Sequence, residues 1–417
     1  MPENRPVPDD SGRVPLTAAR AVSVFGISVV GFMTANLVPV MIVALTGDLG
    51  FSVTGAGTLM TVALLACAAS CLATSRWAAR SGRHAVARAG LALTALGFGA
   101  AAFVPSVPVA VAGVVLGGLG AGGAVSAGGA ALGALRNPDR ASGISGFANR
   151  AIVSVVLFVI PVLGAGTGSA FGLLAGLALA ALLTAGWLPD RPAPEAAATT
   201  ATTAGASAAA PATTSRATTV TGIGLLVCFA LWALSEDSLW AVAATMGAEQ
   251  AGLDETGMGL VLSLSTLGGL IASALVGLAG PRLGRTVPLA VALVAGGVLK
   301  LLAGTVTDPG WYMVVVIAWN TIYMLAFIYI VAVAAALDAS GKWSAPVLGV
   351  YLIGSSFAPV LGTALSAAAG YPVLGVVLAG MTFVLLVPLV LISRRSVRVE
   401  AAARPVPEPG FPQAAIV

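Results

Sequence analysis

Residues 310–337 read GWYMVVVIAWNTIYMLAFIYIVAVAAAL and contain no charged side chain. A run of this length exceeds the roughly 20 apolar residues that a helix needs to cross the hydrocarbon core of a bilayer. Similar runs recur over nearly the whole chain of 417 residues, of which 58% are hydrophobic and only 9% are charged. Soluble globular proteins carry far more charge. We therefore expect a protein that resides in the lipid bilayer.

Apolar windows bounded by proline, glycine or charge predict twelve membrane-spanning helices. Helices are favoured over a barrel because the windows lack alternation of apolar and polar residues. The sequence thus predicts an all-α membrane protein. The expected spans are 20–46, 54–76, 85–104, 107–135, 143–164, 169–188, 220–246, 255–280, 285–305, 310–337, 343–367 and 371–393.

A low-complexity stretch separates the sixth and seventh spans. Residues 189–219 are rich in alanine, threonine and proline and hold too few large apolar groups to build a core. We expect a flexible cytoplasmic linker there, between a six-helix bundle at 20–188 and a second at 220–393. Residues 1–19 lack the features of a signal peptide. They are interpreted as a cytoplasmic tail, as are residues 394–417.

The loop charges predict an orientation. Arginine and lysine fall in the tails, the linker and every second loop, whereas the opposite loops carry Asp48, Glu249, Asp254, Glu255 and Asp308. Basic loops stay in the cytoplasm, so both termini are expected there. A chain with two lysines and much Ala, Gly and Val suggests a high-GC bacterial genome, and hence a multi-pass protein of the bacterial inner membrane.

The two halves of the sequence resemble each other. The segments LGFSVTGAG (49–57) and AGLDETGMG (251–259) precede the second and eighth spans, and IPVLG (160–164) matches APVLG (358–362). After the second and eighth spans, a repeated basic loop aligns Arg80, Gly82 and Arg83 with Arg282, Gly284 and Arg285. Repeated six-helix halves are typical of secondary transporters that expose one central site alternately to either side.

With these motifs the chain resembles the major facilitator superfamily over nearly its whole length. That family has a loop signature G-x-x-x-D-R-x-G-R-R, and here Ser75 and Ala79 stand in place of its first glycine and its acid. The resemblance implies two pseudo-symmetric six-helix bundles. It also implies roles in conformational gating for the six loop residues, and for Pro161 and Gly164 with their counterparts Pro359 and Gly362. The alternatives are a positive-inside anchor with a tight turn for the loops, and a helix bend for the prolines.

The seventh span contains WALSEDSLW (232–240), with two acids in an apolar run. An ionisable side chain at the bilayer centre costs about 2.5 to 3.5 kcal/mol, so we expect Glu236 and Asp237 to be functional, as proton-coupling groups. Trp232, Glu236 and Trp240 recur every four residues and share one helical face, with Asp237 turned about 100° away.

The resemblance implies that the first, fourth, seventh and tenth helices line a central cavity, so this face would look into the transport path. Candidate substrate-binding residues are Phe32, Asn36, Arg150, Trp232, Trp240, Asn320, Tyr323 and Phe327. An apolar, aromatic cavity with a few polar anchors is typical of small-molecule sites.

The alternative is that the two acids form structural ion pairs with Arg150 and Lys300. Depth argues against it, because Arg150 lies about 10 Å from the cytoplasmic start of its helix and Glu236 about 24 Å from its own. We expect Lys300 to extend its ammonium group to the membrane interface.

These observations predict a proton-coupled exporter, an antiporter, of an amphipathic small molecule, and an amine-bearing substrate would suit two acids and two tryptophans. An importer of an organic acid or sugar, with Arg150 holding a carboxylate, is the alternative within transport, and a membrane scaffold or sensor is the alternative outside it. We expect a monomer with no nucleic-acid partner and no cofactor. Cys67, Cys71 and Cys228 lack metal-site spacing, and no nucleophile–base pair suggests an enzyme.

Overall fold

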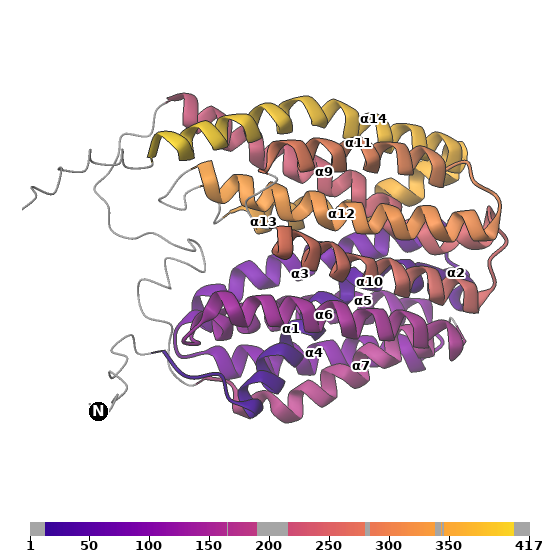
Figure 1. Ribbon diagram of the computed structural model, residues 1–417. Helices are drawn as coiled ribbons and strands as arrows, with labels where there is room; N and C mark the ends of the chain where they lie inside the picture. The colour runs from indigo at the N-terminus through magenta and orange to yellow at the C-terminus, as the bar shows by residue number, and fades with distance from the viewer. Residues whose placement is uncertain are drawn as a thin grey trace, which may run out of the picture.

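The computed structural model describes residues 13–164, 166–189, 216–279, 284–337, 343 and 346–403, and these are almost entirely helical (Figure 1). Eleven of the helices in these ranges are long and apolar enough to cross a membrane. The predicted helical membrane protein is therefore confirmed. Residues 1–12 and 404–417 of the predicted tails, most of the predicted linker, and Arg282 lie outside the described residues, whereas 394–403 continue α14.

The first half begins with a broken helix. The expected span 20–46 is divided at Leu37 into α1 and α2, because Pro39, in the first turn of α2, has no N–H to continue the hydrogen-bond ladder. The remaining elements are continuous, with a short 3-10 turn at Ala185–Trp187. Their bounds are α1 Ala18–Asn36, α2 Val38–Leu49, α3 Val53–Ala79, α4 Arg83–Phe103, α5 Val107–Gly133, α6 Pro138–Val162 and α7 Thr167–Thr184.

The second half ends with a long, kinked helix. Its elements are α9 Arg216–Glu249, α10 Glu255–Ala279, α11 Thr286–Ala303, α12 Pro309–Leu337, α13 Val347–Ser356 and α14 Ala358–Ala403. Gly370 interrupts α14 with φ 81°, a left-handed conformation that suits glycine. The apolar stretch Val347–Val399 has 53 residues, too many for one crossing of a core about 30 Å thick. It therefore covers the last two of the twelve expected spans.

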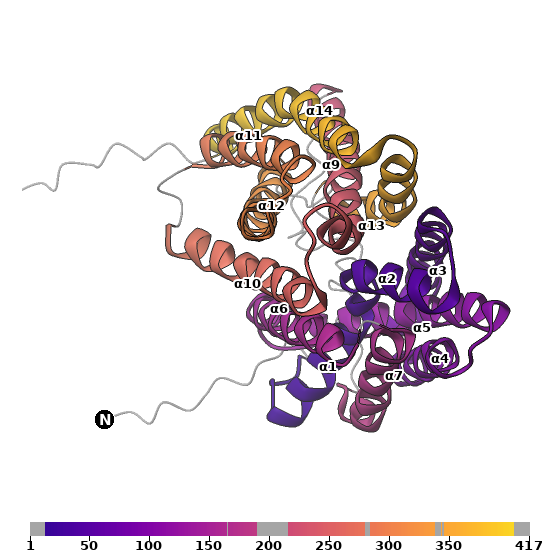
Figure 2. The same ribbon diagram turned by 90° about the vertical axis from the view of Figure 1, so that its right-hand side faces the viewer.

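The helices form two groups (Figures 1 and 2), with α1 to α7 on one side and α9 to α14 on the other. Glycines bring some helices of a group very close together. A methyl group on Gly120 of α5 would lie 2.5 Å from the carbonyl oxygen of Gly90 on α4. The glycines at 117–123 of α5, in the expected fourth span, thus allow the backbones of α4 and α5 to come into contact, as small residues do in membrane helix pairs.

The ends of the helices differ in charge. We call the end with Asp48, Glu249, Asp254 and Asp308 the acidic end, and the end with Arg80, Arg140, Arg285 and Arg394 the basic end. Helices α6, α9 and α11 run from the basic to the acidic end, and α12 runs in the opposite direction.

Contacts between the two halves gather toward the acidic end. Trp240 Nε1 donates to the carbonyl oxygen of Asn36 at 3.2 Å, and the N–H of Val360 donates to Thr61 Oγ1 at 3.1 Å. Ser154 and Ser263 bond at 2.9 Å. A hydrophobic cluster of the first half also includes five second-half residues near that end, Ala241, Ala243, Ala244, Met258 and Leu262.

Nearer the basic end, the buried cluster around Phe229, Tyr329 and Leu389 consists only of second-half residues among those described. The halves are therefore packed together at the acidic end. This packing positions the site that follows.

Candidate transport site

Glu236 lies inside the second half. Its side chain is 3% exposed, and Oε1 lies 2.9 Å from the ammonium nitrogen of Lys300 on α11. The other oxygen, Oε2, accepts a hydrogen bond from Trp319 Nε1 of α12 at 2.8 Å. Both carboxylate oxygens of Glu236 thus have partners on neighbouring helices.

Lys300 is fully buried, so the expectation that it extends to the membrane interface is wrong. Besides Glu236, its ammonium group donates to Ser235 Oγ at 2.8 Å and to Thr382 Oγ1 at 2.7 Å. An ammonium group has three donors, and all three find acceptors here. These acceptors on α9 and α14 make the buried position more favourable than snorkelling to water. The ion-pair alternative is therefore correct for Glu236 and Lys300.

Asp237 has different surroundings. It accepts a hydrogen bond from the hydroxyl of Tyr351 at 3.0 Å and another from the side chain of Ser355, both on α13. The Tyr351 hydroxyl also pairs with that of Tyr323 at 2.5 Å. No cation of the described residues lies within ion-pair distance of Asp237, which is half-buried. Its negative charge is held by neutral donors alone.

The face of α9 that carries Asp237 points at the first half. Trp240, three residues on, reaches Asn36, and Ala241 and Ala244, four and seven residues on, pack in the first-half cluster. The expectation that Glu236 looks into the path while Asp237 turns away is wrong, whereas Trp232 stacks on Tyr323. Glu236 turns inward because Lys300 and Trp319 supply partners there, and that rotation leaves its neighbour at the interface.

Aromatic rings line the second-half side of Asp237. Trp232 stacks on Tyr323 with ring centroids 5.3 Å apart, and Phe327 meets Tyr351 edge-on at 5.2 Å. The sequence predicts three of these rings. It misses Tyr351, although Tyr351 and Ser355 stand one turn apart on α13, a spacing that places two hydroxyls on one face.

Arg150 of α6 stands opposite Asp237. It is half-buried, and its charge interacts with Asp237 and with Tyr323. Arg150 and Asp237 each lie about 12 residues, roughly 18 Å, before the acidic ends of their helices, Val162 and Glu249. The expected difference in depth is wrong because α9, with 34 residues, is longer than α6, with 25, so the starts of the two helices do not lie at one level.

The other predicted binding residues occupy varied positions. Asn36 donates its amide to the carbonyl of Phe32 on its own helix, and Phe32 is 39% exposed. Asn320 is 4% exposed, and its carboxamide oxygen has no hydrogen-bond partner among the described residues. Substrate binding by these residues stays a prediction.

The predicted gating prolines lie at contacts between the halves. Pro161 is a nearest neighbour of Gly259, and Pro359 of Gly57. Gly362 approaches the carbonyl of Ser238 within the second half, and Gly164 ends α6 with φ 90°. These contacts support the interpretation that the prolines and glycines serve close packing of helices, and their role in gating stays a prediction.

The arginines of the basic loops differ in burial, although the loop sequences resemble each other. Arg80 is exposed, whereas Arg83 is 2% exposed and donates to the carbonyl of Pro189 at 2.9 Å. Gly82 precedes α4, and Gly284 has φ 61° just before Arg285, as a tight turn requires. Arg83 thus ties its loop to the chain after α7, which a solvated anchor does not do.

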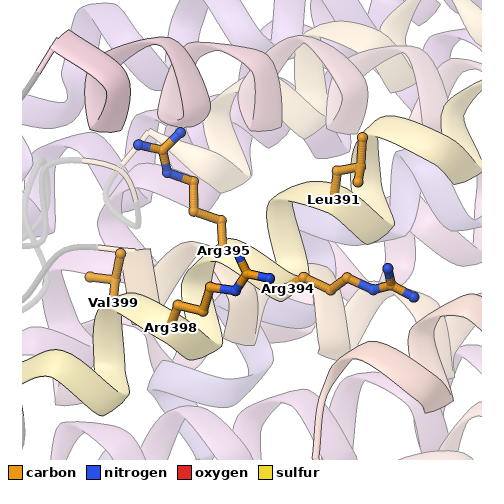
Figure 3. A pocket seen from close by; sticks show the side chains of 5 residues that line it. All are labelled: Leu391, Arg394, Arg395, Arg398 and Val399. Atoms are coloured by element: carbon orange, nitrogen blue, oxygen red, sulfur yellow. The ribbon is translucent and has the colours of Figure 1, made fainter.

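A surface pocket lies apart from the acids, near the basic end of α14. Its lining is Leu391, Arg394, Arg395, Arg398 and Val399, and the three guanidinium groups point in different directions (Figure 3). This pocket lies at the end of the last apolar stretch, Val347–Val399, and contains no residue predicted for the site.

Comparisons with known proteins agree with this architecture. A search of curated proteins found no match. Among solved structures, a mutant of the peptide transporter POT superposes with a TM-score of 0.72 at 15% identity, covering 93% of this chain and 97% of the other. The human organic anion transporter MFSD10 gives 0.64 at 17% identity, with coverage of 90% and 100%. A D-xylose–proton symporter gives 0.65 at 15%, with coverage of 87% and 96%.

At such identities these structures share the fold alone. The family model described as Major Facilitator Superfamily matches residues 23–338, about three quarters of the sequence. The match includes both acids, Arg150, Lys300 and the aromatic rings of α9 and α12. The chain therefore belongs to the Major Facilitator Superfamily.

Proposed function

We propose that this transporter is a proton-coupled exporter of an amphipathic small molecule, and that Asp237 carries the coupling proton. The supporting observation is the contrast between the two acids. Glu236 is neutralised by a buried ammonium group, whereas Asp237 stands at the interface of the halves with hydroxyl donors only. A carboxylate without a fixed cation gains most from binding a proton or a cationic ligand.

Coupling follows from competition for one carboxylate. A proton and a cationic group of the substrate cannot both neutralise Asp237, so binding of one favours release of the other. Rocking of the halves would expose this residue to each side in turn. The packed acidic end is consistent with one of the two end states, in which the site communicates with the basic side.

The aromatic rings support an amphipathic substrate. Phe327, which is half-buried, offers apolar surface near the carboxylate, and the buried rings of Trp232 and Tyr323 pack behind it. The face of an aromatic ring also attracts cations, which suits an amine. A protein of the inner membrane with its basic end in the cytoplasm would collect such a molecule from inside the cell.

Import is the second candidate. Arg150 is half-buried near the interface, where a guanidinium group could hold a carboxylate. Two structural neighbours are named an organic anion transporter and a D-xylose–proton symporter. A scaffold or sensor that moves nothing is the candidate from another class, and transport of any probe excludes it.

Reconstituted protein tests the proposal. Proteoliposomes with an imposed proton gradient are given ethidium, 2-phenylethylamine or phenylalanine, and movement of the probe and of protons is recorded together. We expect the parent to exchange a probe for protons. Asp237→Asn should retain probe binding by the apolar surface but lose the dependence on the gradient.

The matched variant is Glu236→Gln, with Glu255→Gln as an exposed acidic control at the start of α10. Glu236→Gln should keep a gradient-dependent flux in whatever fraction of the protein folds. The assignment of the proton to Asp237 is wrong if Asp237→Asn keeps the pH dependence of the parent.

A further inference from the structure

We infer that the transported molecule carries both a cationic and an anionic group, which Asp237 and Arg150 bind from opposite halves. This inference rests on the proposed function, because it places the substrate at the same interface. It goes further in naming a class, dipolar molecules with an apolar body.

The positions of the two residues on their helices point to a shared space. Arg150 shares its face of α6 with Ser154, one turn on, which bonds to Ser263 of the second half. Asp237 shares its face of α9 with Trp240 and Ala241, which contact the first half. Each charge thus lies one turn from a contact that joins the halves, on the basic side of that contact.

The two charges are near each other without touching. Their charged atoms are farther apart than the 4.0 Å of an ion pair, yet the two residues lie at a similar depth, each about 12 residues before the acidic end of its helix. Direct pairing would leave little room for a ligand. The observed spacing leaves each charge able to receive the opposite charge of a bound molecule.

The local charge balance favours a ligand with both signs. Glu236 and Lys300 neutralise each other inside the second half, so Asp237 and Arg150 are the charges left at the interface at this depth among the described residues. A ligand with only an amine satisfies Asp237 and leaves Arg150 without a counter-charge. A dipolar ligand satisfies both, which matters where water is scarce.

Further groups beside the acid suit such a molecule. Phe327 is half-buried and meets Tyr351, the donor to Asp237, so its ring supplies apolar surface. The buried stacked rings of Trp232 and Tyr323 support it from behind. The acid and these rings together form the cationic end of the site, and Arg150 forms the anionic end.

Matched probes test the inference by binding, without any gradient. The first set is phenylalanine with 2-phenylethylamine and 3-phenylpropanoate, which lack its carboxylate and its amine. The second set, with a longer spacing of charges, is 6-aminohexanoate with hexylamine and hexanoate. Binding to the purified full-length protein is measured by the shift of its thermal unfolding midpoint with probe concentration.

We expect at least one dipolar probe to bind at least tenfold more tightly than both of its single-charge analogues. Arg150→Gln should bind that dipolar probe and the matching amine equally, and Asp237→Asn should bind the dipolar probe and the matching acid equally. Arg140→Gln, an exposed arginine on the same helix, should keep the preference of the parent.

Three results overturn the inference: no binding of either dipolar probe, an amine or acid that binds as tightly as its dipolar partner, or a preference that survives in both site variants. A failure here is distinguishable from a failure of the proposed function. If the parent exchanges ethidium for protons and Asp237→Asn does not, the proposed function is supported even where the inference of a dipolar substrate is refuted.

Discussion

Pro359 packs against Gly57 across the two halves, and Pro161 packs against Gly259 in the corresponding position of the repeat. In sequence, Gly57 matches Gly259 and Pro359 matches Pro161, so the two contacts are pseudo-symmetric copies. Both lie between the site and the acidic end, where the halves are packed together.

The two glycines should differ in their tolerance of a methyl group. A Cβ on Gly57 would lie 2.0 Å from Thr363 Oγ1 and 2.7 Å from the carbonyl of Pro359, whereas one on Gly259 would lie 3.2 Å from its nearest neighbours. We expect Gly57→Ala to shift the population toward separation at the acidic end, and Gly259→Ala to do so much less. Electron–electron distance measurements between spin labels at Gly47 and Glu255, in a background without the native cysteines, would record the shift. Equal distance distributions in the two variants would contradict it.

Removal of Lys300 should leave the buried carboxylate of Glu236 without its counter-charge. Lys300→Met leaves Glu236 with Trp319 as its one donor, and breaking a buried pair in this way typically costs about 3 to 5 kcal/mol. We expect a marked fall in the thermal unfolding midpoint in detergent. The double variant Glu236→Gln with Lys300→Met removes both charges and should recover much of the loss, whereas additive losses would show that the two residues do not stabilise each other.

Tyr351 should set the pH at which exchange occurs. Its hydroxyl donates to Asp237, which favours the charged carboxylate, so Tyr351→Phe disfavours that form. The protonated form then persists to higher pH, and the midpoint of the pH profile of proton-coupled exchange should rise. Tyr371→Phe, which removes a hydroxyl bonded to Glu249, is the matched control and should leave the profile in place. A downward shift with Tyr351→Phe would refute the assignment.

The two arginines of the first basic loop should behave differently. Arg83 is buried and bonds to Pro189, whereas Arg80 is exposed. We expect Arg83→Gln to lower the free energy of unfolding by about 1.5 to 3 kcal/mol, as is typical of a lost charged hydrogen bond, and so to lower the thermal midpoint. Arg80→Gln should have little effect on either quantity. If both arginines serve only as positive anchors, the two variants will have equal midpoints.

Much of the fold is predictable because the bilayer imposes it. Apolar length alone indicates the spans, and the repeated loops and IPVLG motifs indicate two related halves. The break at Gly370 falls between the expected spans 343–367 and 371–393, whereas the break at Leu37 is harder to foresee, since a proline in a membrane helix is often tolerated without a break.

The site is less predictable, because neighbouring residues on a helix point about 100° apart. The spacing of Trp232, Glu236 and Trp240 indicates a shared face but not which way it turns. That direction depends on Lys300, which is distant in sequence and has no motif to reveal its partner. The depth of Arg150 relative to Asp237 likewise depends on how far each helix extends beyond the membrane at its basic end, which apolar length alone does not give.

The acceptor that Trp240 uses across the interface is the main-chain oxygen of residue 36, while the Asn36 side chain bonds within its own helix. Every amino acid provides that oxygen. Related transporters could therefore exchange Asn36 for another residue and retain the indole hydrogen bond. The side chain at this position can change in evolution while the contact that joins the two halves is kept.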